Sequence, residues 1–288
     1  FFQKRNLPIG IQLYTLADML RENPEAAVSG VAEIGYETVE IPSYLGKAPT
    51  DLRALFDANG LRCTAAHVGM RPGTTEEPGL FGDIDKLSAD MHLLGVTNVY
   101  APSMMIPAGI GISPREGEGY AFISRVAQAM GEEHWKRMAG QLNDIGRKLA
   151  ANDIAFGYHN HNYEFAPVGD RTGFDMLLAE TDPELVSFEL DVGWAAAAGY
   201  DPATLFTRDR GRYSAIHMKD IQPSTEPNLA LKMNPTEVGS GALRWETLLP
   251  AAYDAGVRHF FLEQEPPFTM PRIEAARTGY NFLKTLEA

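Results

Sequence analysis

The chain has very little cysteine: Cys63 is the only one among its 288 residues. A single cysteine cannot form an intrachain disulfide, and it cannot supply the several thiolates of a zinc or iron–sulfur site. A chain of this length can bury a large apolar core without such cross-links. Any metal site must therefore use other side chains.

Basic residues and long apolar runs are also scarce. The 25 Lys and Arg residues stand against 38 Asp and Glu residues, so the formal net charge is −13. This acidic balance argues against the basic surface that binds a phosphate backbone, and we expect no nucleic-acid partner. No run of about 18 apolar residues is present, so we expect neither a transmembrane helix nor a membrane partner.

The printed sequence begins at Phe1 and not at a methionine. Such a start is compatible with a trimmed chain and with removal of a signal peptide. The sequence therefore leaves two compartments open, the cytoplasm and, for a processed precursor, the periplasm.

The chain is rich in alternating short apolar segments and amphipathic segments, which predict strands and helices. Eight strands that are each followed by a helix close most simply into a (β/α)8 TIM barrel, and no Pro- or Ser-rich linker divides the chain. We therefore expect one domain over residues 1–288. The strands are expected at residues 9–13, 38–41, 63–68, 98–102, 155–159, 186–191, 214–218 and 259–263, and the helices at residues 24–34, 50–59, 84–94, 133–151, 173–180, 202–207, 245–255 and 271–286.

Two strand-to-helix connections are long, at residues 69–83 after the third strand and at residues 102–132 after the fourth. These connections lie at the end of a TIM barrel that carries the chemistry, and long loops there commonly cover a site. The second one carries Phe122 and Ile123, and we expect it to form a lid. The alternative is a disordered insertion.

Imidazole and carboxylate side chains end each of the last four predicted strands. Residues two apart point to the same side of a strand, so each end presents a pair of polar groups. The pairs are His159 with His161, Glu189 with Asp191, His217 with Lys219, and Glu263 with Glu265.

Four of these residues, one from each strand, are predicted to hold a single divalent metal ion: His159, Asp191, His217 and Glu263. Buried charges need a partner or a metal, and two carboxylates balance the charge of a divalent ion. Mixed nitrogen and oxygen donors favour Mn, Co, Zn or Fe over Ca. For each residue alone, a core histidine or an ion-paired carboxylate is the alternative.

Further polar and aromatic residues at strand ends are predicted to line a substrate site. Trp194 offers an apolar face on which a sugar ring can stack, although the same residue type packs cores. Packing, capping or ion pairing is the alternative for each residue. The predicted set is Gln12, Tyr14, Glu40, His67, Trp194 and Glu265.

At these residues the chain resembles the sugar phosphate isomerase/epimerase superfamily, whose members have the xylose isomerase-like barrel. The resemblance runs through the segments IGIQLYTL, GYETVEI, AAHVG, YHNHNYEF, FELDVGW, HMKD, EVGSGALRW and FFLEQE. It implies a TIM barrel with one divalent metal held from the last four strands, which carries over onto the same four residues.

The chain departs from the superfamily pattern at two positions. In many sugar epimerases of the superfamily the fifth-strand ligand is a glutamate that also serves as one of two acid/base groups, but His159 stands there in this chain. A metal-bound imidazole is a poor base, which argues against a symmetric two-carboxylate epimerisation. Trp194 stands where the sixth-strand motif has a histidine.

The residues and the resemblance together predict a metal-dependent sugar isomerase or epimerase that acts through an enediolate. A group near the metal removes a proton from the carbon beside a carbonyl, and the place to which that proton returns decides the product. The candidates for proton transfer are Glu263, Glu189, His161 and Glu265, with Lys219 as a donor to the oxyanion.

Three alternatives stay open. Expulsion of a leaving group from the same intermediate gives a lyase on 3-keto-glycosides, and a barrel that binds a sugar without catalysis is the second alternative. The third is phosphodiester cleavage as in endonuclease IV-like repair enzymes, against which the acidic charge argues.

A small sugar is the expected partner, and a homo-oligomer is compatible with the sequence. The turn Gly239-Ser240-Gly241 is a candidate phosphate contact or a simple loop.

Overall fold

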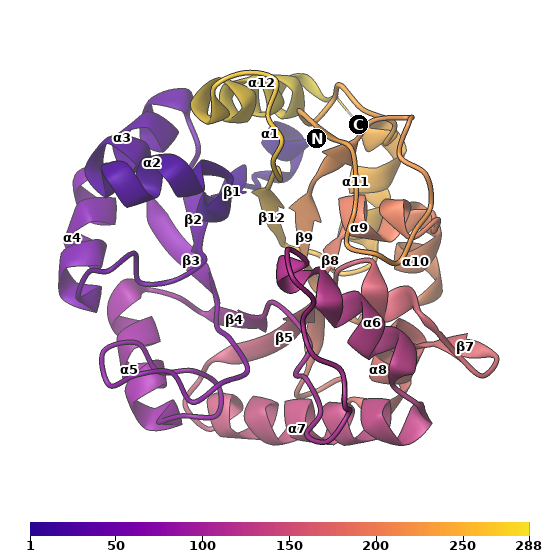
Figure 1. Cartoon of the computed structure of the whole chain (residues 1–288). Helices are drawn as coiled ribbons and strands as arrows, with labels where there is room; N and C mark the ends of the chain where they lie inside the picture. The colour runs from indigo at the N-terminus through magenta and orange to yellow at the C-terminus, as the bar shows by residue number, and fades with distance from the viewer. Residues whose placement is uncertain (288) are drawn as a thin grey trace.

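The computed structural model describes residues 1–287 as a closed barrel of parallel strands inside a ring of helices (Figure 1). Neighbouring strands follow chain order, and the last strand pairs with the first, with Gly10 beside Phe261. This confirms the predicted (β/α)8 barrel. The barrel strands are β1 (Gly10–Gln12), β2 (Thr38–Ile41), β3 (Arg62–His67), β4 (Asn98–Ala101), β5 (Ala155–His159), β8 (Ser187–Asp191), β9 (Tyr213–Met218) and β12 (His259–Leu262).

The predicted helices are present, with ends that differ from the expected ones by at most two residues. Gly35 and Gly95 end two of them with φ of 116° and 84°, a conformation that glycine adopts without strain. No helix of residues 1–287 is long and apolar enough to cross a membrane. The helices of the ring are α3 (Pro24–Ile34), α4 (Pro49–Ala58), α5 (Ile84–Leu94), α7 (Glu132–Ala150), α8 (Gly173–Glu180), α10 (Pro202–Arg208), α11 (Trp245–Asp254) and α12 (Arg272–Thr285).

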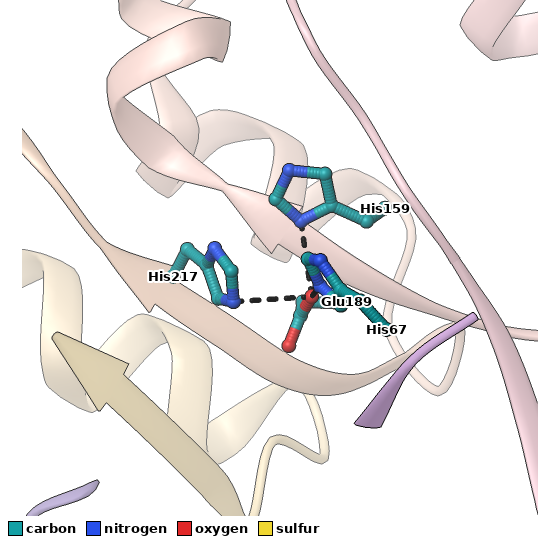
Figure 2. A group of neighbouring side chains, drawn as sticks. All are labelled: His67, His159, Glu189 and His217. Carbon is teal, nitrogen blue, oxygen red and sulfur yellow. Dashed lines mark hydrogen bonds and ion pairs between the residues drawn. The ribbon is translucent and has the colours of Figure 1, made fainter. Parts of the chain in front are cut away.

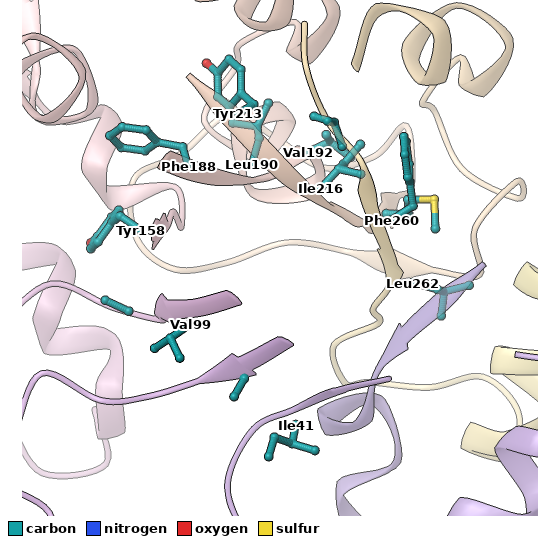
Figure 3. Packing of buried hydrophobic residues seen from close by; sticks show 14 of the residues in the cluster. Ile41, Val99, Tyr158, Phe188, Leu190, Val192, Tyr213, Ile216, Phe260 and Leu262 are labelled. Carbon is teal, nitrogen blue, oxygen red and sulfur yellow. The ribbon is translucent and has the colours of Figure 1, made fainter. Parts of the chain in front are cut away.

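The main apolar core lies between the strands and the helices (Figure 3). On β8, Phe188 and Leu190 belong to this core, whereas Glu189 and Asp191 alternate with them and face the barrel interior. Burial of each large apolar side chain stabilises the fold by about 1.5–3 kcal/mol. The alternation therefore fixes which side chains of a strand can form a site.

Three connections at the carboxyl ends of the strands are long. Two were expected, and the second contains α6 (Phe122–Ala129). The third runs from residue 219 to residue 244, between β9 and α11, and the sequence pattern did not single it out. Further short elements are α1 (Phe2–Arg5), α2 (Ala17–Glu22), α9 (Val192–Ala197), β6 (Pro167–Val168) with β7 (Arg171–Thr172), and β10 (Asp220–Ile221) with β11 (Pro235–Thr236).

The barrel interior below the site holds neutral polar side chains beside a small apolar cluster that includes Ala65, Ala215 and Phe261. The Tyr100 hydroxyl lies 2.9 Å from Ser214 Oγ, which lies 2.7 Å from Ser187 Oγ. Nearer the amino ends of the strands, Asn98 Nδ2 lies 3.1 Å from His259 Nε2. These pairs satisfy buried polar groups with hydrogen bonds.

Candidate metal centre and active site

The carboxyl ends of β5, β8, β9 and β12 bring the four predicted metal ligands together. His217 Nδ1 lies 2.9 Å from Glu263 Oε2 and 3.8 Å from Asp191 Oδ2, and donor atoms of these three residues lie within 4.8 Å of one another. His159 Nε2 lies 3.9 Å from Asp191 Oδ2. All four residues are buried. The barrel thus gathers two imidazoles and two carboxylates from four separate strands.

The Lys219 side chain lies among the carboxylates of this group. Its Nζ is 2.7 Å from Asp191 Oδ2, 2.8 Å from Glu263 Oε2 and 3.3 Å from Glu265 Oε1, and it is 5.2 Å from the centre of a Trp194 ring. Burial lowers the pKa of Lys219, but these carboxylates outweigh it and hold the pKa well above its ordinary value. Lys219 is therefore an ammonium, and the carboxylates beside it are arranged around positive charge.

The donor set fits a divalent transition metal. Burial, and after it the charge of His217, lowers the pKa of His159 to about 4, so this imidazole is neutral. His159 Nε2 and Asp191 Oδ2 face one another at 3.9 Å, which is too long for a hydrogen bond. A cation between two such electron-pair donors is the arrangement that metal-binding proteins use, and nitrogen with carboxylate oxygen suits Mn, Co, Zn or Fe.

An inner cluster shares His159 and His217 with the predicted ligand set and is centred on Glu189 (Figure 2). Glu189 Oε2 lies 2.8 Å from His67 Nε2, 3.0 Å from His159 Nδ1 and 3.2 Å from His217 Nε2. Burial raises the pKa of Glu189, but His217 and His159 outweigh it and bring the pKa well below its usual range. Donor atoms of these four residues also lie within 4.8 Å of one another. The cluster is thus a second group with the composition of a metal site.

Glu40 and Gln12 adjoin the inner cluster from the first two strands. Glu40 Oε2 lies 2.6 Å from His217 Nε2 and accepts a hydrogen bond of 2.8 Å from Gln12 Nε2. Gln12 Oε1 in turn accepts from the Tyr14 backbone amide. Burial, and then the neighbouring charge of Glu189, raises the pKa of Glu40. Both side chains are fully buried, so they support the site and offer no surface to a substrate.

A cavity of about 750 Å³ opens above these residues. Four of the six residues predicted to line a substrate site do line it, namely Tyr14, His67, Trp194 and Glu265, whereas Gln12 and Glu40 do not. His159, His161 and Glu263 reach the same cavity, while Asp191, His217, Glu189 and Lys219 are fully buried and are not among its lining residues.

His161 stands in the aromatic wall of the cavity. Its ring stacks on Tyr163 with centres 5.2 Å apart and planes at 8°, and it lies 5.6 Å from a Trp194 ring. Its backbone amide donates to Glu164 Oε2 at 2.8 Å, and Glu164 Oε1 accepts from the Tyr158 hydroxyl. Burial holds the pKa of His161 well below its usual range. The cavity thus presents a neutral imidazole.

Comparison with known families agrees with this barrel. The model of the xylose isomerase-like TIM barrel family matches residues 28–286. The chain belongs to this family. An inosose dehydratase of Geobacillus kaustophilus (strain HTA426) is 24% identical over 202 residues, which cover 69% of this chain but only 62% of that protein. An inosose dehydratase of Clostridium botulinum (strain Eklund 17B / Type B) is 23% identical over 295 residues, covering 96% of this chain and 94% of that protein.

A solved structure shows the same fold. The sugar phosphate isomerase/epimerase from Parabacteroides distasonis ATCC 8503 superposes with a TM-score of 0.72 at 24% identity, and the match covers 97% of this chain and 94% of that one. The relatives are thus named for both isomerase/epimerase and dehydratase activities.

Several residues that line the cavity of this xylose isomerase-like barrel were not predicted. Tyr163 follows the fifth strand inside the segment YHNHNYEF, and its spacing of two from His161 was an available signal. Ile123 of α6 does reach the cavity, as the lid expectation requires. No described residue of the other long loop, 69–83, is among the lining residues. The lining residues from the third connection are Leu231, Lys232, Met233 and Asn234.

The glycine-rich turn at residues 239–241 encloses one of the chain's own carboxylates. Asp220 Oδ2 accepts hydrogen bonds from the amides of Gly239 and Gly241 at 3.0 and 3.2 Å and from Trp245 Nε1 at 2.9 Å. Asp220 is fully buried. Because these donors already hold an anion, the turn is the simple structural loop and not a phosphate site.

Proposed function

We propose that this chain is a divalent-metal-dependent lyase that removes a hydroxyl or alkoxyl group β to the carbonyl of a cyclic polyhydroxylated ketone. The observation that carries the proposal is an unlike pair of groups beside the proposed ligands: the imidazole of His161 and the carboxyl of Glu265 line one cavity. Elimination needs one base for a carbon-bound proton and one acid for the leaving oxygen. Epimerisation at one carbon is better served by two like groups on opposite faces.

The fifth-strand residue supports the same choice. His159 Nδ1 contacts the Glu189 carboxylate at 3.0 Å, and its Nε2 is the nitrogen that we assign to the metal. An imidazole with both nitrogens engaged has no electron pair left to accept a substrate proton. The second carboxylate of a symmetric epimerase is therefore missing from this position.

The proposed reaction balances with these two groups. His161 takes the proton from the carbon beside the carbonyl, and the electron pair of that C–H bond forms a double bond to the neighbouring carbon. The C–O bond at that carbon breaks. Burial raises the pKa of Glu265 against the opposing charge of Lys219, and in its protonated form Glu265 gives a proton to the leaving oxygen. The products are an unsaturated ketone and water or an alcohol.

His159, Asp191, His217 and Glu263 would hold the metal. When bound, a divalent ion supplies Lewis-acid stabilisation of the charge that develops on the carbonyl oxygen. The stacking of His161 against Tyr163 orients the base.

The cavity supports a substrate with a polar reacting end and a less polar outer part. Its volume of about 750 Å³ lies within the range of about 300–1,000 Å³ that suits drug-sized ligands. The apolar part of its lining includes Trp194, Ile123 and Met233. These side chains can pack against a sugar ring and against an aglycone. The relatives named inosose dehydratase support a cyclic ketone as the substrate, and the cavity volume supports 3-keto-glycosides as well.

The test is to incubate Mn²⁺- or Co²⁺-loaded protein with an inosose and with a 3-keto-glucoside in D₂O and to follow the products by NMR. We expect alkene signals and release of water or alcohol. The variant His161→Asn should lower kcat by about 10²–10⁴-fold, as loss of a general base does. The variant His92→Asn alters an exposed histidine of α5 and should leave kcat unchanged.

Isomerisation or epimerisation is the second candidate, because Glu263 and Glu265 both reach the cavity from the end of β12. Deuterium incorporation with an intact C–O bond and an altered configuration would replace the lyase proposal by this one. Binding of either compound with neither exchange nor elimination would favour a sugar-binding barrel without catalysis.

A further inference from the structure

The Glu189 carboxylate contacts three imidazoles at once. Its Oε2 lies 2.8 Å from His67 Nε2, 3.0 Å from His159 Nδ1 and 3.2 Å from His217 Nε2 (Figure 2). Glu189 is fully buried and is not among the lining residues of the cavity, so it does not meet a substrate directly. Its function must therefore be exerted through the histidines.

Hydrogen bonding by Glu189 decides which nitrogen of each histidine carries a proton. An ionised carboxylate only accepts hydrogen bonds, so each ring nitrogen that contacts it must be an N–H. His159 then has Nε2 free. His217 Nδ1 lies on the other side of its ring, in contact with Glu263 Oε2, and a metal that binds there replaces the proton of this nitrogen. These two atoms are the ones near the outer carboxylates: His159 Nε2 is 3.9 Å from Asp191 Oδ2, and His217 Nδ1 is 2.9 Å from Glu263 Oε2.

A second carboxylate acts on His217 in the same direction. Glu40 Oε2 lies 2.6 Å from His217 Nε2, the same nitrogen that faces Glu189. Gln12 Nε2 donates to that Glu40 oxygen and so holds it in place. Two acceptors from β2 and β8 therefore fix the orientation of one imidazole that β9 supplies.

We propose that Glu189 is a positioning residue, which fixes the tautomer and ring orientation of His159 and His217 so that the metal binds on the side of Asp191 and Glu263. Carboxylates that accept from metal-bound histidines do this in metalloproteins generally, and their loss costs about 10–100-fold in metal affinity. The proposal rests on the outer metal site of the proposed function, but not on the reaction assigned to it.

The inner cluster itself is the competing location for the metal. His67, His159, Glu189 and His217 could supply three nitrogens and one oxygen within 4.8 Å. In that case Glu189 would be a ligand, and Asp191 and Glu263 would not. The tautomers required by the two arrangements are opposite, because an imidazole nitrogen bound to a metal cannot carry a proton.

Metal binding without substrate separates the two arrangements. Equilibrium dialysis and Co²⁺ absorption spectra would be measured for the parent protein and for Glu189→Gln, Glu189→Asp and Asp191→Ala, with far-UV circular dichroism to confirm folding. We expect Glu189→Gln to keep one Co²⁺ per chain with about 10–100-fold weaker affinity. Glu189→Asp should recover part of that loss, and Asp191→Ala should abolish binding.

A matched control is Glu164→Gln, which alters another fully buried glutamate and should leave Co²⁺ affinity unchanged. X-ray absorption of the Co²⁺ protein should show two imidazole ligands. Three imidazoles, or loss of all binding in a folded Glu189→Gln with retention in Asp191→Ala, would overturn the proposal and place the metal in the inner cluster. Because no substrate is used, failure of the proposed reaction leaves this outcome unaffected.

Discussion

The two ends of the barrel interior hold buried polar groups by different means. Toward the amino ends of the strands, Tyr100, Ser187 and Ser214 are neutral groups that satisfy one another with hydrogen bonds of 2.7 and 2.9 Å. At the carboxyl ends, Asp191 and other buried carboxylates stand among imidazoles and one ammonium. Hydrogen bonds suffice for the first arrangement, whereas the second needs positive charge, because an unpaired buried ion is far more costly than an unpaired hydroxyl.

The neutral groups toward the amino ends of the strands form a structural layer, the lower layer. The buried carboxylates at the carboxyl ends, with their imidazoles and ammonium, form a layer suited to chemistry, the upper layer. Barrel stability requires only that the interior be filled and its polar groups bonded, and the lower layer does both. Buried carboxylates contribute little to stability that apolar residues could not supply. Their concentration at the end where a TIM barrel carries its active site therefore indicates that they serve metal or substrate binding.

The largest effect is expected from Lys219→Met, which removes the fixed positive charge of the upper layer. The carboxylates of Asp191 and Glu263 would then repel one another, and loss of one partner of a buried ion pair costs about 3–5 kcal/mol. A bound divalent ion would replace the missing charge, so Mn²⁺ should restore stability. The measurement is the free energy of unfolding in urea with EDTA and with saturating Mn²⁺.

The control for this variant is Lys232→Met, which removes an exposed lysine at the cavity rim and should alter stability little in either condition. The comparison of the two layers fails if Lys219→Met is as stable as the parent in EDTA. It also fails if Mn²⁺ stabilises the parent and the variant equally.

The sequence was sufficient to predict which strand ends meet, because an eight-stranded parallel barrel places all its carboxyl ends on one side. It was not sufficient to predict the depth of each side chain. Glu189 and Asp191 both point inward, but two residues along a strand separate them by about 6.6 Å. Whether the deeper one contacts His159 or a substrate depends on how far the neighbouring strands are shifted, which residue patterns do not encode.

The third long connection was missed for a similar reason. Its hairpin has two residues in each strand, β10 and β11, too few to give a periodic pattern. Its conformation depends on Asp220, which accepts bonds from amides near residue 240 that are distant in sequence. Asp220 lies two residues after the predicted strand that carries His217, and nothing in that position predicted that it would organise a loop.

The next largest effect is expected from Glu164→Gln, which tests a buried carboxylate that has no counter-charge. Burial raises the pKa of Glu164 from 4.5 to about 7. The folded state therefore binds this proton more tightly than the unfolded state, and stability falls as pH rises through that interval. The loss amounts to about 3 kcal/mol above pH 7.

Glutamine carries no charge at any of these pH values, so the variant should lack this part of the decline. Urea unfolding at pH 5 and pH 8 measures the slope for both proteins, with Glu226→Gln, an exposed position, as the control. Equal pH slopes for the parent and Glu164→Gln would show that Glu164 is ionised in the folded protein without a loss of stability. Glu164 would then resemble the carboxylates of the upper layer, which are stabilised as anions.

The smallest effect is expected from Ser214→Ala in the neutral layer. The Tyr100 hydroxyl and Ser187 Oγ would each lose a partner, at a cost of about 1–2 kcal/mol in the free energy of unfolding. Co²⁺ affinity, measured by equilibrium dialysis, should stay at the parental value, because no charge or ligand is altered. Ser187→Ala removes one of the same bonds together with the bond from Ser187 Oγ to the Phe156 carbonyl at 3.2 Å, and it should cost a similar amount. A drop in Co²⁺ affinity with either variant would mean that the lower layer sets the positions of the histidines above it, and the two layers would then have to be treated as one network.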